Sequence, residues 1–349
     1  MTAPTPPAPN AVQSAIRRIA FGDSLDAELA TEAFGTMMRG EATAAQIAAL
    51  LIGLRVKGET AEEVTGAARA MRGAMVRLPV VSSEGLVDTC GTGGGAVPTF
   101  NISTAAALLA AGAGVRIAKH GNRSFTTQCG SADVLEQLGV TLEAPLELAT
   151  RALEEAGITF MFAPAMHPAM RHVGPVRREL GIPTVMNIVG PLANPAGAAR
   201  QVVGVAERAR MPLLAGALAS LGAAHALVVH GEPGMDEISP LGPTHVAEVR
   251  DGAITEWVIE PRDYGFSGLL AADLAGGSPA DNARTIVEVL GGQGNPAATA
   301  AVVLNAAGAL YVAPGSRSFA DCVTAAATAL ANGAGTAALE RMRRAYTAH

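Results

Sequence analysis

The sequence has few cysteines, few aromatic residues and no cluster of basic charge. Its 349 residues include three cysteines, one tryptophan and 3% aromatic residues. Cys90, Cys129 and Cys322 lie far apart, which excludes a CxxC zinc or redox site and favours a reducing compartment. No run reaches the roughly 20 unbroken apolar residues of a membrane span, so we expect no membrane contact. The formal charge is −6 and the basic residues are scattered rather than clustered, which disfavours nucleic-acid binding.

The remaining composition indicates a globular protein. Hydrophobic residues make up 49% of the chain, enough to exclude disorder over its whole length. At about 150 residues per domain, 349 residues suggest roughly two domains. The first ten residues, MTAPTPPAPN, lack the basic and apolar regions of a secretory signal. We therefore expect a disordered tail over residues 1–10 of a cytoplasmic protein.

The amino-terminal part of the chain has a helical pattern. Between residues 10 and 77 apolar residues recur at helical spacing, with breaks that predict four short helices. Thr60 precedes a stretch with two acidic residues in its first turn, which predicts a helix that begins near Ala61. We expect a helical domain over residues 11–78, which helices around residues 173–195 are candidates to complete.

A second pattern begins after Pro79, where short β-branched segments alternate with helical ones. This alternation predicts a mainly parallel sheet with helices on both faces. Asp251 and Gly252 separate two apolar segments and predict a hairpin with a two-residue turn. The predicted fold class is thus α/β, with a small all-helical domain, a large α/β domain over residues 79–349 with a mainly parallel central sheet, and C-terminal helices. The expected strands are residues 86–88, 115–118, 158–162, 201–205, 226–230, 246–250 and 254–259; the expected helices include 103–113, 132–138, 212–221 and the chain from about 280 onward.

The first unusual loop follows the expected strand at residues 86–88. It contains the glycine-rich stretch DTCGTGGG, and TFNIST then begins a helix. Glycines let backbone N–H groups approach an anion, and a helix N-terminus adds donors and a favourable dipole. The loop therefore resembles a phosphate cradle, although a tight structural turn is the alternative.

Two further loops follow expected strands. In the loop that begins at Lys119, two cations, several hydroxyls and an amide suit an anion or a sugar, and a solvated loop is the alternative. In the loop over residues 231–237, Asp236 and Glu237 are adjacent carboxylates, which suit Mg²⁺ because this ion takes few protein oxygens. An ordinary acidic surface is the alternative reading of that pair.

Several motifs together resemble one enzyme family. GTGGG…TFNIST, KHGNRS, HPAMRHVGPVRRELG, GPLANP and the HG…DE loop are similar, in order and spacing, to the anthranilate phosphoribosyltransferases from about residue 12 to the end. The resemblance implies transfer of the 5-phosphoribosyl group of phosphoribosyl pyrophosphate (PRPP) to the amine of anthranilate in tryptophan biosynthesis. It also implies inversion at C1, Mg²⁺ as cofactor, and a homodimer formed through the helical domain.

The resemblance further implies roles for individual residues. Lys119, Asp236 and Glu237 would be catalytic, and Ser103, Asp236 and Glu237 would bind magnesium. The residues implied for PRPP are Gly91, Gly94, Gly95, Thr99, Asn101, Ile102, Ser103, Thr104, Lys119, Thr126, Thr127 and Ser131, and those implied for anthranilate are Gly91, His120, Asn122 and Arg177.

The chain departs from the family pattern at three places. Gly95 stands where the glycine loop usually ends in aspartate, which removes a carboxylate from the phosphate site. Residues 126–129 read TTQC, where a Ser-Ser-Lys-Ser type of sequence is usual, so a cation is absent. Met170 occupies a position that is aromatic in some relatives. These departures bear on metal number and on the choice of acceptor.

Three alternative functions are compatible with the sequence. They are a nucleoside phosphorylase-like enzyme, a phosphoribosyltransferase for another aminobenzoate, and a nucleic-acid-binding relative of the fold. The KHSTGG-type phosphate motif of the pyrimidine phosphorylases is absent. We assign no catalytic role to the histidines at 167, 172, 225 and 230 or to the cysteines at 90 and 129, and we interpret residues 190–195 as a hinge.

Overall fold

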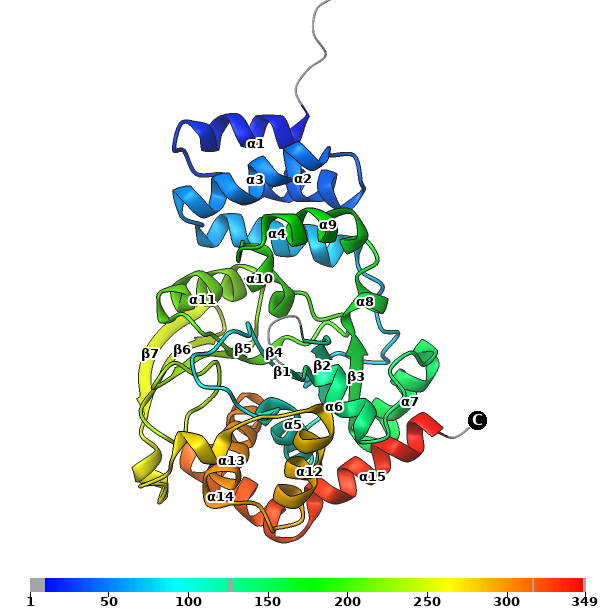
Figure 1. The fold of residues 1–349 in the computed structure, drawn as a ribbon, viewed down its shortest axis with the longest axis vertical. Coiled ribbons are helices and arrows are strands. Elements are labelled where there is room, and N and C mark those ends of the chain that lie inside the picture. The colour runs from blue at the N-terminus through cyan, green and yellow to red at the C-terminus, as the bar shows by residue number, and fades with distance from the viewer. Residues whose placement is uncertain (1–9, 125–127, 316, 348–349) are drawn as a thin grey trace, which may run out of the picture. The chain divides into compact units, whose positions relative to one another are not determined.

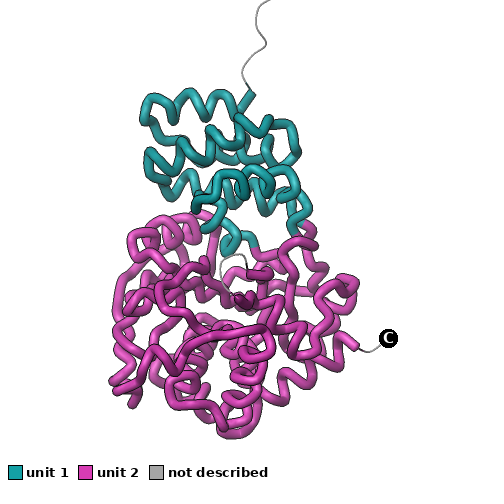
Figure 2. Tube along the Cα trace, viewed as in Figure 1, with its two compact units in different colours: residues 1–75, 167–193 teal, residues 76–166, 194–349 magenta. Residues whose placement is uncertain are grey.

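The computed structural model describes residues 10–124, 128–315 and 317–347. The expected tail therefore lies outside the described residues except for Asn10, which caps the first helix. The chain divides into two compact units, one formed by residues 1–75 and 167–193 and the other by residues 76–166 and 194–349 (Figure 2).

Unit 1 is helical, and the four helices predicted for its amino-terminal part are confirmed. Thr60 caps the fourth helix at Ala61 with a reciprocal capping box, as its sequence predicts. Phe34 and Leu50 are fully buried in the core of this unit. The helices are α1 (Ala11–Ala20), α2 (Ala27–Met38), α3 (Ala44–Lys57), α4 (Ala61–Ala74), α9 (Met170–Leu180) and α10 (Met186–Val189), followed by the 3-10 helix η1 (Gly190–Leu192).

Unit 2 contains a seven-stranded sheet in the order β3-β2-β1-β4-β5-β6-β7. The pairs among β1 to β5 are parallel, and β6 and β7 add an antiparallel hairpin, so the predicted mainly parallel sheet is confirmed. Asp251 (φ 49°) and Gly252 (φ 83°) form the predicted two-residue turn. The strands are β1 (Val87–Gly91), β2 (Ile117–Gly121), β3 (Ile158–Phe162), β4 (Arg200–Gly204), β5 (His225–Gly231), β6 (Thr244–Arg250) and β7 (Ala253–Ile259).

Helices cover both faces of this sheet (Figure 1). In the figure α11 lies on one face, and α5 and α13 lie on the other; α13 is buried along nearly its whole length. The helices of unit 2 are α5 (Ile102–Gly112), α6 (Ser131–Gln137), α7 (Leu146–Ala156), α8 (Ala163–Met166), α11 (Met211–Ser220), α12 (Pro279–Leu290), α13 (Pro296–Val312), α14 (Phe319–Ala331) and α15 (Ala334–Thr347), with 3-10 helices η2 (Arg208–Arg210), η3 (Pro261–Tyr264) and η4 (Ala271–Leu274).

The position of β2 differs from the prediction in a way that matters for the site. We expected the strand over residues 115–118 and a loop from Lys119, but β2 ends at Gly121. Lys119 pairs with Phe160 and His120 pairs with Met161, and both residues are buried. The expectation failed because pairing with β3 extends the strand through two polar residues that a local pattern assigns to a loop.

Among the helices that the structure describes, no single one is long and apolar enough to cross a membrane. Taken together, the consecutive helices α14 and α15 have the length and the apolar composition of a membrane span, but the chain bends by 69° between them.

Candidate active site

Four parallel strands, β1, β2, β4 and β5, end in glycine at the carboxyl edge of the sheet. A Cβ atom on Gly204 would lie 1.6 Å from the carbonyl oxygen of Asp236, and one on Gly91 would lie 2.5 Å from Asp236 Oδ2. The missing side chains therefore let the acidic loop after β5 lie directly on the ends of β1 and β4. Strand order reverses between these two strands, which is where open α/β sheets bind ligands.

The acidic pair contacts the glycine loop and the start of α5. The amide of Gly93 donates to Asp236 Oδ2 at 2.8 Å, and the amide of Ser103 donates to Glu237 Oε1 at 3.1 Å. A Cβ atom on Gly95 would lie 3.0 Å from Asp236 Oδ1. The structure thus brings together the first and third loops that the sequence singled out, and position 95 faces Asp236.

Burial is the largest influence on the pKa of both carboxyls. It raises the pKa of Asp236, against the hydrogen bond from Gly93. Burial also raises the pKa of Glu237 to about 8, and the neighbouring charge of Asp236 adds to this shift. Lys119 and the Ser103 amide act in the opposite direction on Glu237. Two such carboxyls next to each other favour a bound cation.

Lys119 is a buried cation beside this pair, with 3% of its surface exposed. Its Nζ donates to the carbonyl oxygen of Thr89 at 2.5 Å and to Ser103 Oγ at 3.1 Å. Burial lowers the pKa of Lys119, although Asp88 and Glu237 act to raise it. Lys119 therefore joins β2 to β1 and to the start of α5.

Asp88 and Asn194 form a buried pair that the sequence did not lead us to assign to the site. Asn194 Nδ2 donates to Asp88 Oδ2 at 2.7 Å and to the Ala118 carbonyl at 2.8 Å, and the His120 amide donates to Asp88 Oδ1 at 3.1 Å. We interpreted residues 190–195 as a hinge, but the side chain of Asn194 ties β1 to β2. A charged residue inside a buried strand was the one signal that pointed to this pair.

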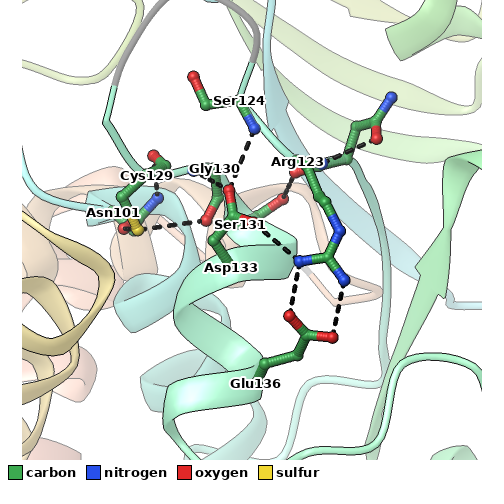
Figure 3. A network of polar contacts seen from close by, with 9 residues as sticks. Asn101, Arg123, Ser124, Cys129, Gly130, Ser131, Asp133 and Glu136 are labelled. Atoms are coloured by element: carbon green, nitrogen blue, oxygen red, sulfur yellow. Dashed lines mark hydrogen bonds and ion pairs between the residues drawn. The ribbon is translucent and has the colours of Figure 1, made fainter.

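On both sides of residues 125–127, the chain between β2 and α6 is bound to α6 (Figure 3). Arg123 makes a two-pronged contact with Glu136, at 2.5 and 2.7 Å, and a third with Asp133 at 2.9 Å. Asp133 Oδ2 also accepts the amides of Ser124 at 3.2 Å and of Gly130 at 2.8 Å. Of the two cations that the sequence placed in this loop, Arg123 is therefore neutralised by α6 and Lys119 belongs to β2.

Other predicted residues of this loop have contacts within the protein. Ser131 Oγ donates to the Asn122 carbonyl at 3.3 Å, and Asn122 Oδ1 accepts the amide of Arg123 at 2.7 Å. Thr126 and Thr127 lie outside the described residues.

At the start of α5, Ile102 and Thr104 are buried, with 0% and 1% of their surfaces exposed. Their amides donate to the carbonyls of Phe100 and Asn101. By contrast, Gly94 is exposed and Thr99 is partly exposed. Roles of these four residues in binding PRPP stay predictions.

Arg177 lies on α9 in unit 1 and is partly buried, whereas Arg178 is exposed. Burial lowers the pKa of Arg177 and also lowers that of His167, to about 4. In unit 2, His225 contacts Glu248 at 2.8 Å and His230 contacts the Val205 carbonyl at 2.8 Å, as a structural role for both requires. The assignment of Arg177 to anthranilate stays a prediction.

The residues at these strand ends suit Mg²⁺ better than a metal whose ligands all come from the protein. Within the described ranges, no group of three or more His, Cys, Asp and Glu side chains could hold an ion. Asp236, Glu237 and the Ser103 hydroxyl supply only oxygen donors. This set suits Mg²⁺, which usually takes one or two carboxylates and completes its shell with water and substrate phosphates.

Comparison with known proteins defines the class of enzyme. Residues 13–75 match the helical bundle domain of a glycosyl transferase family, and residues 83–336 match the a/b domain of that family. This fold, with an acidic pair on the strand ends, is that of a glycosyl transferase.

Full-length relatives narrow the class. The anthranilate phosphoribosyltransferase of Rubrobacter xylanophilus is 51% identical, over 95% of this chain and 97% of the relative. The crystal structure of the same enzyme from Thermus thermophilus has a TM-score of 0.90 and 42% identity, covering 96% of this chain and 99% of that one. The Saccharomyces cerevisiae enzyme in complex with PRPP and Mg has a TM-score of 0.87 and 26% identity, covering 96% and 98%. The chain belongs to the anthranilate phosphoribosyltransferase family.

Proposed function

We propose that this enzyme transfers the 5-phosphoribosyl group of PRPP to the amine of anthranilate, releasing pyrophosphate, in tryptophan biosynthesis. Family membership supports the reaction, and one observation supports the location that we propose for it. Asp236 and Glu237 lie on the strand ends and accept amide hydrogen bonds from Gly93 and Ser103, so the acidic loop lies against the glycine loop and the start of α5.

The chemistry requires positioning and electrostatic stabilisation. When pyrophosphate leaves C1, positive charge develops on the ribose ring and negative charge on the leaving group. Asp236, Glu237 and Ser103 would hold Mg²⁺, which supplies positive charge to the departing pyrophosphate. Lys119 adds a fixed positive charge beside Ser103. Gly94, which is exposed, would orient the phosphates through its backbone amide.

Attack by the amine from the opposite face inverts C1. An arylamine is neutral near pH 7, so the chain needs no strong base. Arg177 would pair with the anthranilate carboxylate, and Asn122, His120 and Gly91 would orient the ring. The residues that we propose for PRPP binding are those that the family resemblance implies. At Ile102, whose side chain is buried, we propose a backbone contact.

Three further properties belong to this proposal. The enzyme is a homodimer through its helical unit, it acts in the cytoplasm, and its partners are small molecules rather than nucleic acid. Sedimentation of the purified protein tests the dimer directly.

Loss of anthranilate fluorescence, followed with PRPP and Mg²⁺, tests the reaction. We expect consumption of anthranilate that needs both PRPP and the metal. Parallel reactions with 4-aminobenzoate, and with uridine and phosphate, test the alternative acceptor and the phosphorylase reaction. Faster turnover in either parallel reaction would contradict the proposal.

A further inference from the structure

A segment of unit 2 far along the chain packs against the stretch that precedes α5. The amide of Phe100 donates to the Leu274 carbonyl at 2.9 Å. A Cβ atom on Gly276 would lie 2.4 Å from the carbonyl oxygen of Thr99, so this backbone approach needs a glycine. The segment from Leu274 to the start of α12 therefore backs the TFNIST stretch, and no motif in the sequence marks it.

Asn282, on the first turn of α12, makes the polar contact in this packing. It is buried, with 3% of its surface exposed. Its Nδ2 donates to Asn101 Oδ1 at 2.9 Å, and its Oδ1 accepts the amide of Gly277 at 2.7 Å. The side chain thus holds both its own segment and Asn101.

Asn101 in turn contacts Cys129, which lies in residues 128–130 just before α6, a stretch that we call the Cys129 loop (Figure 3). Its Nδ2 donates to the Cys129 carbonyl at 3.3 Å, and its Oδ1 contacts Cys129 Sγ at 3.2 Å. The amide side chain of Asn101 is therefore engaged by protein on both of its atoms. It joins α12, the start of α5 and the Cys129 loop into one network.

We propose that Asn282 is a positioning residue for PRPP binding: through Asn101 it sets where the start of α5 and the Cys129 loop lie. The inference rests on the proposed function, because it assigns these two segments to the PRPP site. The physical reason is that each amide in this partly buried network is oriented by the donors and acceptors of its neighbours, so the removal of one of them loosens the rest. Loss of the Asn282 donor leaves Asn101 Oδ1 with only the weak Sγ donor of Cys129, so the Asn101 side chain is held less firmly.

The test compares Asn282→Asp and Asn282→Ala with Ser278→Ala. Asn282→Asp keeps the shape but replaces the donor to Asn101 with an acceptor. Ser278 caps the same helix, where its side chain accepts the amide of Asp281, and its hydroxyl bonds to that aspartate rather than to Asn101. The control therefore weakens α12 to a similar degree without touching the network. Gly276→Ala displaces the same segment by a second, independent change.

Three measurements separate positioning from stability. They are the melting temperature, the affinity for PRPP by calorimetry together with KM and kcat, and the alkylation rate of Cys129 by peptide mass spectrometry. Cys90 and Cys322 serve as internal references for alkylation. For both Asn282 variants we expect a rise in the KM for PRPP of about tenfold or more, because small displacements of binding groups are costly. The KM for anthranilate should change little, and Cys129 should react faster.

Several outcomes would overturn the inference. One is a PRPP affinity in the Asn282 variants equal to that of Ser278→Ala. Another is faster alkylation of Cys129 with unchanged PRPP affinity, which would mean a purely structural network. If the unaltered enzyme does not bind PRPP, the proposed function fails instead, and the alkylation rates still report whether Asn282 holds the Cys129 loop.

Discussion

The amide of Ser103 donates to Glu237 Oε1 at 3.1 Å and joins the start of α5 to the loop after β5. Lys119 Nζ reaches the hydroxyl of the same serine at 3.1 Å. Ser103 therefore lies between the buried cation and the acidic pair. Changes to these charges, or to the elements that hold them in place, should have measurable effects on activity and stability.

Replacing Asp236 by Asn and Glu237 by Gln together should slow turnover by orders of magnitude. The double variant keeps side-chain volume but removes both charges that would hold Mg²⁺. Steady-state rates at limiting Mg²⁺ give the effect, and circular dichroism checks that the fold is intact. Activity near that of the unaltered enzyme would contradict the metal assignment.

Stability should depend on pH through Glu237. Its pKa is raised from 4.5 to about 8 in the folded state, so the folded state binds the proton more tightly than the unfolded chain does. The neutral form favours folding, and stability is lost as pH rises from about 4.5 to about 8. Glu237→Gln carries no charge, so its melting temperature relative to the unaltered protein should rise across that range.

Thermal unfolding in EDTA at pH 5, 6.5 and 8.5 measures this difference. A constant gap between the two proteins would show that Glu237 titrates normally.

Restoring a carboxylate with Gly95→Asp should change the dependence of rate on Mg²⁺ and PRPP. The new Cβ would lie 3.0 Å from Asp236 Oδ1 and 3.2 Å from the Gly234 carbonyl, so a charge there acts at short range. Gly95→Asn is the matched control, because it has the same shape without the charge. Equal titration curves for the two variants would mean that the effect is steric.

Arg177→Ala should raise the KM for anthranilate and leave the KM for PRPP nearly unchanged. We expect a loss of about 1.5 to 3 kcal/mol if the charged hydrogen bond forms in a sheltered site. Arg178→Ala is the control, since adjacent residues on a helix point about 100° apart. A larger effect from Arg178→Ala would reverse the assignment, and small equal effects would remove it.

Asn194→Ala should destabilise the fold by about 3 kcal/mol, because it leaves the buried Asp88 carboxylate without its side-chain donor. Urea unfolding measures the loss. Asn295→Ala is the comparison. Asn295 is the N-cap of α13, and its loss should lower the free energy of unfolding by only about 1 kcal/mol. Similar losses would show that Asp88 finds another partner.

Much of the fold could be predicted because the signals are local. Helical spacing and the cap at Thr60 specify the first four helices, and Asp251-Gly252 specifies the hairpin turn. The glycine loop and the Asp236-Glu237 pair were also recognisable, because each follows a strand. Each of these features depends on residues that are close together in the sequence, so a local pattern predicts it.

The positions of charges and amides depend on contacts that form only in the folded chain. Lys119 extends a strand because β3 pairs with it, and Arg123 is neutralised by two carboxylates on α6. Asn282 contacts Asn101 across 181 residues of the sequence, and Asn194 contacts Asp88 across 106 residues. The elements, their order and the acidic and glycine-rich loops could be predicted from local patterns in the sequence. Burial and distant hydrogen bonds are properties of the folded chain, so no pattern of adjacent residues specifies them.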